Sequence, residues 1–596
     1  MLRAPNRDRR LQPIGEGREL TSYRRGFVAL LLGALALMRM GFHEPLIEGW
    51  IIQIAETALL VLYAGLIVYG AARISQREHR REFLRVTRFE QFVILAGLCL
   101  CWWWPGLITA GVLLLLVNMT RLYLRLTQIA LPPGLVFVSS FLGLIIVGTG
   151  LLTLPAATPA DHPEYASITV TDAAFTITSA ISQTGLVVRP TGEGFTRFGQ
   201  IIILIWIQVG ALGVIVFGAL LASVMGKSFG LKATQTIAEG TEQGWAGQLS
   251  LQKLVAFIIV FTHVVELVGA VILYFSWPTE WPGMPDDFEG PLNRAYHAIF
   301  FSVSGFCNAG FVTTDGSMQG LRTHWLPHAV LAPMIVLCSI GFIVLDNIGR
   351  VVVAKIRGIH MDENGRLIRL SLNTKLILVT TLVLYLFGML IIYIGEVTQA
   401  GVDPSVAVLD AHFMSINRTS GFDTIAPSEM GMLGQLMTIF LMFVGGSPGS
   451  VAGGVKLIAV AVMALTVWAT IRGRLETTAF GRAIPDAFVR KCAAIVVMCL
   501  ALCLVSAGVL VVTESTGDPS VDPAFREILF ETVSAFGTTG LSLGITGSLS
   551  DAGKITIGIT MFLGRVGVLA VVAALVATAA GKSVRREFPR EEVVVY

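Results

Sequence analysis

The sequence predicts an all-α polytopic membrane protein. We expect four pseudo-repeated units around one pore, each made of a helix, a pore helix, a filter and a returning helix, plus extra N-terminal transmembrane helices. Three observations predict this fold. Of the 596 residues, 54% are apolar and only 14% are charged, with a mean hydropathy of +0.74, which is more apolar surface than a soluble protein can cover. Many apolar segments exceed the roughly 20 residues that cross a bilayer. A short motif also recurs four times.

In this motif an apolar, helix-like run ends in small polar residues and then breaks at a glycine. The clearest copy is at 530–545, where Ser534-Ala535-Phe536 precedes Gly537-Thr538-Thr539-Gly540-Leu541. Similar copies stand at 175–188, 300–312 and 413–424. Aligned on Gly185, Gly310, Gly421 and Gly540, they are separated by 125, 111 and 119 residues by subtraction. One copy means little, but four at a steady period, each between long apolar segments, indicate a structural repeat.

A helix followed by a strand of small residues and a membrane helix is how an ion-channel filter is built, with backbone carbonyls replacing the water around an ion. Such irregular backbone is tolerated at that depth only where it lines a wet cavity. Glycine suits the strand because it has no Cβ and lets the backbone approach the ion. For any one glycine, close helix packing is the alternative; four in repeated context favour the filter.

The motifs resemble those of the Trk/Ktr/HKT superfamily of potassium transport subunits, over about residues 131–585. Further matching strings are Gly148-Thr149-Gly150-Leu151-Leu152, Ala452-Gly453-Gly454-Val455-Lys456, Phe480-Gly481-Arg482 and Met561 to Gly567. The resemblance implies an ion selectivity filter that holds K⁺ by backbone carbonyls of Gln183, Thr184, Gly185, Leu186, Cys307, Asn308, Ala309, Gly310, Phe311, Arg418, Thr419, Ser420, Gly421, Phe422, Gly537, Thr538, Thr539, Gly540 and Leu541. In that family a serine at the first key glycine accompanies sodium preference, so Gly185 favours potassium.

Residues 445–456 break an otherwise apolar helix, because glycine and proline weaken a helix interior by roughly 1 and 3 kcal/mol each. We expect no equivalent break in the other three units. The resemblance implies that this segment is a mobile intramembrane gate, against the alternative of a static kink. The expected gate residues are Gly445, Gly446, Ser447, Pro448, Gly449, Ser450, Gly453, Gly454, Lys456 and Arg565. An intramembrane arginine must face protein or water, and the resemblance places Arg565 in the conduction path just below the filter; a structural ion pair is the alternative.

In chain order, we expect a basic tail and extra transmembrane helices over 1–130, forming two hairpins with the second turning at Trp102-Trp103-Trp104-Pro105-Gly106. The alternative for 90–121 is one span plus a re-entrant or surface helix. Pore units follow at 131–224, 251–350, 375–472 (with gate loop 445–456) and 491–580, and a cytoplasmic tail covers 581–596. The returning helices are expected at 198–224, 326–350, 428–470 (interrupted) and 554–580.

Charge supports one orientation. The loops 350–375 and 471–491 and the tail 581–596 are rich in Lys and Arg, which places them and both termini in the cytoplasm by the positive-inside rule. The opposite loops carry Asp161, Glu164, Asp286, Asp287, Glu289, Asp403, Asp410, Glu514, Asp518 and Asp522. Acidic outer mouths of this kind would concentrate cations, although ordinary solvated loops explain any single residue.

The expected function is potassium uptake across the cytoplasmic (inner) membrane, with no enzyme activity, no nucleic acid partner and no covalently bound cofactor. The resemblance implies a homodimer and a cytoplasmic ring of nucleotide-binding, RCK-type regulatory subunits, with NAD or ATP/ADP bound only on those. The alternatives are a Na⁺-coupled K⁺ symporter or a Na⁺-conducting member of the same family. A membrane-embedded metal-dependent enzyme using His263 and Glu266, three residues apart, is less favoured because zinc sites want three or four ligands. We also expect Glu531 and Arg418 to brace the filters by hydrogen bonding.

Overall fold

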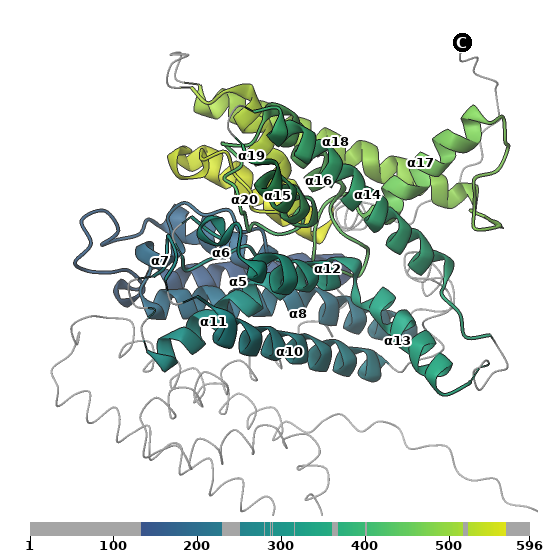
Figure 1. Ribbon diagram of the computed structural model, residues 1–596, viewed down its shortest axis with the longest axis horizontal. Coiled ribbons are helices and arrows are strands. Elements are labelled where there is room, and N and C mark those ends of the chain that lie inside the picture. The colour runs from purple at the N-terminus through teal and green to yellow at the C-terminus, as the bar shows by residue number, and fades with distance from the viewer. Residues whose placement is uncertain are drawn as a thin grey trace, which may run out of the picture. The chain divides into compact units, whose positions relative to one another are not determined.

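The computed structural model describes residues 133–228, 251–278, 280–285, 288, 290–314, 316–359, 361, 367–399, 402–515 and 522–567. The predicted N-terminal hairpins, the cytoplasmic tail and the last part of the fourth returning helix lie outside these residues. Nearly all regular structure is helical, and the described helices follow the predicted order of outer helix, pore helix and returning helix. This arrangement is drawn in Figure 1.

The first two units contain α5 (Pro133–Leu152), α6 (Val170–Ser182), α7 (Thr191–Gly194), α8 (Arg197–Ser228), α10 (Leu251–Ser276), α11 (Pro291–Phe306), α12 (Ala332–Ile340) and α13 (Phe342–Ile356). Short turns of helix stand at η1 (Pro155–Ala157), η2 (Gln319–Leu321) and η3 (Pro327–Leu331). The last two units contain α14 (Leu372–Val397), α15 (Pro404–Ile416), α16 (Met432–Val444), α17 (Leu457–Ile471), α18 (Asp486–Glu514), α19 (Phe525–Gly537), η4 (Thr546–Ser548) and α20 (Asp551–Val566). A small antiparallel hairpin, β1 (Thr478–Ala479) and β2 (Arg482–Ala483), joins α17 to α18.

The four units adjoin one another in chain order. Within each unit the outer helix packs on its pore helix, as α10 does on α11 and α14 on α15. Between units, α8 packs on α10 and α11, α12 on α15, α16 on α19, and α20 on α6. Because the fourth unit returns to the first through α20 and α6, the contacts between units close on themselves.

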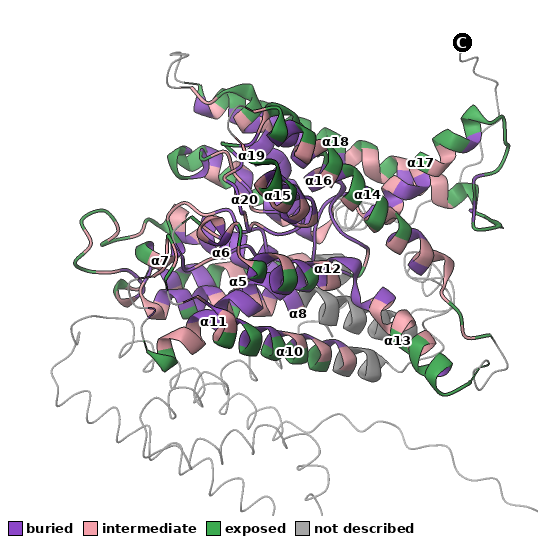
Figure 2. Cartoon of the chain, viewed as in Figure 1, coloured by how far each residue is buried: buried purple, intermediate pink, exposed green. Residues whose placement is uncertain are grey.

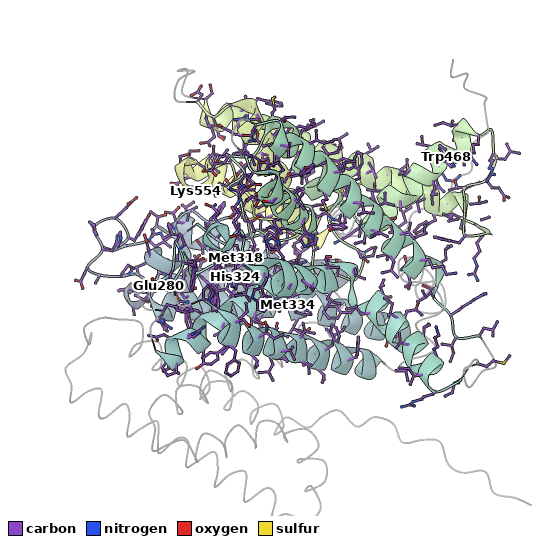
Figure 3. The ribbon with its side chains drawn as sticks, viewed as in Figure 1. Glu280, Met318, His324, Met334, Trp468 and Lys554 are labelled. Carbon is purple, nitrogen blue, oxygen red and sulfur yellow. The ribbon has the colours of Figure 1, made fainter. Side chains whose placement is uncertain are left out.

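Three described helices are long and apolar enough to cross a bilayer unaided: Phe257–Ser276 within α10, Leu372–Val397 and Asp486–Glu514. Their apolar side chains include many that are exposed in this chain, such as Leu267 and Phe275 on α10 and Leu382 and Leu386 on α14. In Figure 2 these exposed faces lie on the outside of α10 and α14. Lipid replaces water around such faces, so the chain is an all-helical membrane protein.

One predicted element is wrong. The returning helix of the second unit, expected as one helix at 326–350, is broken at Gly341 into α12 and α13, which meet at 98°. Gly341 has φ +93° and ψ 144°, a conformation that is essentially reserved for glycine. The expectation that only the third unit is interrupted therefore fails: α16 and α17 are separated by residues 445–456, and the second unit has its own break.

Candidate functional site

The four motif glycines meet in one place. A methyl group added to Gly185 would lie 3.2 Å from the Cα of Gly310, and one on Gly310 would lie 2.5 Å from the Cα of Gly421. One on Gly421 would lie 3.1 Å from the Cα of Gly540, and one on Gly540 would lie 2.9 Å from the Cα of Gly185. Each glycine thus faces the next in chain order, and the fourth faces the first. Residues more than 100 positions apart form a closed ring of backbone.

A side chain would clash with backbone at Gly185, Gly310 and Gly540. A side chain on Gly185 would come within 2.5 Å of the carbonyl oxygen of Ala309, and one on Gly540 would overlap the carbonyl oxygen of Thr184. Gly185, Gly310 and Gly540 also have φ values of +88°, +71° and +94°, which L side chains rarely adopt. The ring therefore packs these backbone segments more closely than side chains would allow.

Three of the four strands share a backbone conformation. Gln183, Asn308 and Thr538, each two residues before the key glycine, have φ values of +58°, +56° and +47°. The residue after each donates back to its pore helix: Thr184 N to Ser179 O at 2.8 Å, Ala309 N to Ser304 O at 2.8 Å, and Thr539 N to Ser534 O at 2.9 Å. The pore helix thus sets the strand that follows it.

The third strand is different. Asn417 ends α15 with φ −75°, and Ser420 N donates to Asn417 O at 3.0 Å. Gly421 does not share the positive φ of the other three glycines. The ring is therefore only pseudo-fourfold.

Side chains join neighbouring strands. Thr539 Oγ1 donates to the carbonyl oxygen of Arg418 at 3.0 Å, and Asn308 Nδ2 donates to Thr419 Oγ1 at 3.3 Å. These bonds tie the second, third and fourth strands into one rigid unit. Of the 19 filter residues expected from the sequence, all are buried except Gly421 and Gly540, which are partly exposed.

The carboxyl ends of the four pore helices stand immediately before the ring. A helix carries partial negative charge at this end because its last carbonyl groups have no partners within the helix. In a low-dielectric surrounding these ends stabilise a positive charge. Carbonyl oxygens and helix dipoles together suit a dehydrated monovalent cation.

The side chain of Glu531 braces the segment after the fourth strand. It accepts hydrogen bonds from Ser542 Oγ at 2.7 Å and from Thr546 Oγ1. Arg418 joins the third and fourth strands through its backbone, since its carbonyl oxygen accepts the bond from Thr539, and its side chain is buried.

Residues 445–456 form a loop that contacts the fourth strand, where Gly453 N donates to Thr538 Oγ1 at 2.9 Å. Val455 N and Lys456 N donate to Phe443 O and Val444 O at 3.1 Å, so the loop folds back on the end of α16. Ser447 N donates to Ser339 O at 3.0 Å, which joins the loop to the second unit. Lys456 Nζ donates to Ala452 O at 2.6 Å. The loop borders a cavity of about 230 Å³, whose walls include Lys456, Lys491 and Phe536.

Arg565 lies on α20 and is buried. Its Nη2 donates to Gln183 Oε1 at 2.8 Å and to Gly210 O at 3.0 Å, while its Nε has no partner. No carboxylate is described within ion-pair distance of it among residues 133–567 with their gaps. The guanidinium therefore stands as a buried positive charge against Gln183. The ion-pair alternative finds no described partner.

His263 and Glu266 do not form a pair. His263 lies on an exposed face of α10 with Nδ1 at 2.8 Å from Ile259 O. Glu266 is buried and accepts from Gln208 Nε2 at 3.2 Å and Cys307 Sγ at 3.5 Å. In the part of the chain that the structure describes, no three His, Cys, Asp or Glu side chains come together. Sequence spacing alone could not show that these two side chains point apart.

The expectation of an acidic outer mouth is wrong for two of its residues. Asp410 is fully buried in α15, where Arg322 donates from Nε at 2.7 Å and Thr424 from Oγ1 at 3.0 Å. Glu514 is buried and accepts from Ser550 N at 2.9 Å. Asp403 does remain exposed at the start of α15. The hydroxyl and backbone amide of Ser405 donate to Asp403 and hold the pKa of this carboxyl below its usual range.

Three features of this region had no signal in the sequence. They are the bond of Gly453 N to Thr538 Oγ1 at 2.9 Å, the break at Gly341, and the buried pair of Arg322 and Asp410. Each feature either joins residues of different units or depends on backbone angles. The hydrophobic periodicity of the sequence shows neither contacts between units nor single backbone angles.

Comparison with known proteins places this geometry among cation transporters. Residues 145–585 match the family model TrkH, described as a cation transport protein. The Ktr system potassium uptake protein B of Bacillus subtilis is 32% identical over 446 residues, 74% of this chain and 92% of the relative. The potassium/sodium uptake protein NtpJ of Enterococcus hirae is 31% identical over 471 residues, 78% of this chain and 97% of the relative.

A solved structure shares the fold. The potassium transporter TrkH from Vibrio parahaemolyticus aligns with a TM-score of 0.59 at 17% identity, covering 83% of this chain and 97% of the other.

Proposed function

Since the chain belongs to the TrkH family of cation transport proteins, we propose that it carries K⁺ across a membrane through a filter formed by the ring of Gly185, Gly310, Gly421 and Gly540. The observation that carries this proposal is the closed ring itself, in which each glycine faces the next within van der Waals range. A cation that enters the ring exchanges its water for backbone carbonyl oxygens at little net cost.

The choice of K⁺ rests on the first strand. Gly185 leaves that quarter of the ring free of a side chain, as Gly310, Gly421 and Gly540 do in the other three quarters. The Ktr relative of Bacillus subtilis is named as a potassium uptake protein. The Enterococcus relative is named for potassium and sodium, which keeps a Na⁺-coupled symporter or a Na⁺-conducting protein as the second candidate.

The gate in this proposal is the loop 445–456, because it interrupts the third unit and is hydrogen-bonded both to Ser339 of the second unit and to Thr538 of the fourth strand. Arg565 adds an electrostatic barrier: a buried guanidinium against the first strand repels a cation that leaves the filter. Opening would require the loop to move, and the adjacent cavity of about 230 Å³ offers room for part of that movement.

The remaining parts of the proposal follow the family resemblance. We expect a homodimer in the cytoplasmic membrane, each protomer with its own pore, and cytoplasmic RCK-type subunits that bind the regulatory nucleotide. The basic loops 350–375 and 471–491 are the candidate contact surfaces. Phe480 lies on this surface, at the tip of the β1–β2 hairpin, and its side chain is exposed. Lys375 Nζ lies 5.8 Å from the centre of its ring.

The test is cation flux into liposomes that hold the purified full chain, with K⁺, Rb⁺, Na⁺ and Li⁺ compared in turn. A second chain lacking residues 445–456 is measured beside it. We expect K⁺ and Rb⁺ to pass faster than Na⁺ and Li⁺, and the loop-deleted chain to pass them faster without any partner. Equal rates for all four ions would overturn the filter assignment, and unchanged flux after deletion would overturn the gate.

A further inference from the structure

The loop 445–456 rests directly on the fourth filter strand. Gly453 N donates to Thr538 Oγ1 at 2.9 Å, and both residues are buried. A methyl group on Gly453 would lie 2.5 Å from that hydroxyl oxygen and 3.0 Å from the carbonyl oxygen of Gly537. The loop is therefore in contact with the strand at a point where only glycine fits.

Thr538 occupies an unfavourable backbone conformation. Its φ of +47° and ψ of 51° lie in the left-handed region, where a β-branched residue is an outlier. The side chain at this position must therefore contribute something that glycine or asparagine would not, since such strain persists only where the surroundings impose it.

The equivalent residues in two other strands use their side chains to reach a neighbouring element. Gln183 donates to Ile207 O at 3.0 Å and accepts from Arg565. Asn308 donates to Thr419 of the next strand. By the same placement, Thr538 reaches the loop. The other hydrogen bonds described from the loop to a different unit go to the second unit, through Ser339 and Phe342.

We propose that Thr538 is a positioning residue whose hydroxyl latches the loop 445–456 onto the filter and so holds the conduction path closed. This inference rests on the proposed function. The strand has its own attachment to the third unit, because Thr539 Oγ1 donates to Arg418 O. When the loop leaves, the bond that breaks is the one from Gly453 N to Thr538 Oγ1.

Removing the hydroxyl should weaken the closed state. A buried N–H without an acceptor is penalised only while it stays buried, so the open loop, where water can reach Gly453, is unaffected. The penalty for one such group corresponds to a shift of about 5- to 150-fold in the balance between open and closed forms. Thr538→Val is the suitable change, because valine keeps the β-branched shape and the backbone strain while it lacks the acceptor.

The experiment measures Rb⁺ and Na⁺ flux in liposomes holding the full chain, without any partner protein. Thr538→Val is compared with Thr538→Ser, which keeps a hydroxyl. The matched control is Thr532→Val. Thr532 is a fully buried threonine of α19, the helix that precedes Thr538, and its hydroxyl donates to Ile528 O within that helix. Thr538→Val is also made in the chain that lacks residues 445–456.

The latch predicts that Thr538→Val raises Rb⁺ flux about fivefold or more above that of Thr538→Ser at an unchanged ratio of Rb⁺ to Na⁺, while Thr532→Val behaves as the wild type. In the loop-deleted chain Thr538→Val should change nothing further. The latch is wrong if Thr538→Val leaves the flux unchanged, or if it lowers the ion ratio, since that marks damage to the filter. If the chain lacking residues 445–456 does not fold, the ratio of Rb⁺ to Na⁺ flux through Thr538→Val still distinguishes loss of the latch, which keeps the ratio, from damage to the filter, which lowers it. Absence of flux from every variant would instead overturn the proposed function, and the latch with it.

Discussion

Phe342 N donates a hydrogen bond to the carbonyl oxygen of Gly449 at 3.2 Å. Phe342 is the first residue of α13, directly after the 98° break in the second unit, and Gly449 lies in the loop that interrupts the third unit. The two broken helices therefore meet at their breaks. A movement of α13, which leads into the basic loop 350–375, would act directly on the loop 445–456.

The break at Gly341 gives the first prediction. A methyl group there would lie 3.1 Å from the carbonyl oxygen of Pro448 and 3.2 Å from the carbonyl carbon of Gly449, and φ is +93°. Gly341→Ala should therefore displace the loop and raise cation flux, at a cost of about 1–3 kcal/mol in backbone strain. Gly349→Ala, in the helical part of α13 with nothing within 4 Å, is the matched control and should leave flux unchanged. Equal behaviour of the two variants in the liposome assay would show that the break does not position the loop.

Arg565 gives the second prediction. Arg565→Gln removes the buried charge and should raise cation flux, because the barrier below the filter disappears. The carbonyl oxygen of Gly210 loses a hydrogen-bond donor, so the free energy of unfolding should fall by about 1–3 kcal/mol. Arg565→Lys keeps the charge and should pass cations at close to the wild-type rate. If the lysine variant conducted as fast as the glutamine variant, the side chain would act by packing and not by charge.

The buried pair of Arg322 and Asp410 gives the third prediction, for stability. The Asp410 side chain is fully buried, whereas the Arg322 side chain is 31% exposed. Arg322→Gln strands a buried carboxylate and should cost about 3–5 kcal/mol. Asp410→Asn leaves a guanidinium that can reach water and should cost less, about 1–3 kcal/mol. The double variant should be more stable than Arg322→Gln alone, as measured by thermal unfolding in detergent.

The control for this pair is Arg526→Gln. Arg526 pairs with Glu527 at 3.9 Å while 48% exposed, so its loss should cost less than about 1 kcal/mol. A loss of similar size for Arg322→Gln and Arg526→Gln would contradict the burial argument.

The helices and the four glycines could be predicted from the sequence because both signals are local and repeated. The apolar run of α10 was expected at 251–276 and is found at Leu251–Ser276. The first pore helix was expected at 170–182 and is found at Val170–Ser182. Four repeated units arranged around one axis bring their equivalent residues together. The contacts of Gly185 with Gly310 and Gly540 could therefore be predicted from the repeat alone.

What could not be predicted depends on single residues in three dimensions. Gly341 stands in an apolar helix like many packing glycines, and only its φ reveals the break. Asp410 resembles a solvent-exposed acidic residue in the sequence. Its burial depends on Arg322, which stands 88 residues away and gives no local signal. The latch at Thr538 requires a backbone amide of Gly453, and an amide has no sequence signature.

Gly185 gives the last prediction, which tests the ring itself. A serine at this position would place Cβ 2.5 Å from the carbonyl oxygen of Ala309 at a φ of +88°, so the first or second strand must move. Because that carbonyl belongs to the ring, the cage around the ion changes shape, and Gly185→Ser should lower the ratio of K⁺ to Na⁺ flux by about tenfold, the equivalent of about 1.4 kcal/mol.

The matched control is Gly143→Ala on α5, where an added methyl group meets nothing within 4 Å. Gly143→Ala should keep both the rate and the ion ratio. A further comparison separates filter from gate: Gly185→Ser in the chain lacking residues 445–456 should show the same loss of selectivity, because the atoms that the serine meets belong to Ala309 and Gly310 and not to the loop. If selectivity survived Gly185→Ser in both chains, discrimination between K⁺ and Na⁺ would have to arise elsewhere along the path, and the buried charge of Arg565 would be the next position to test.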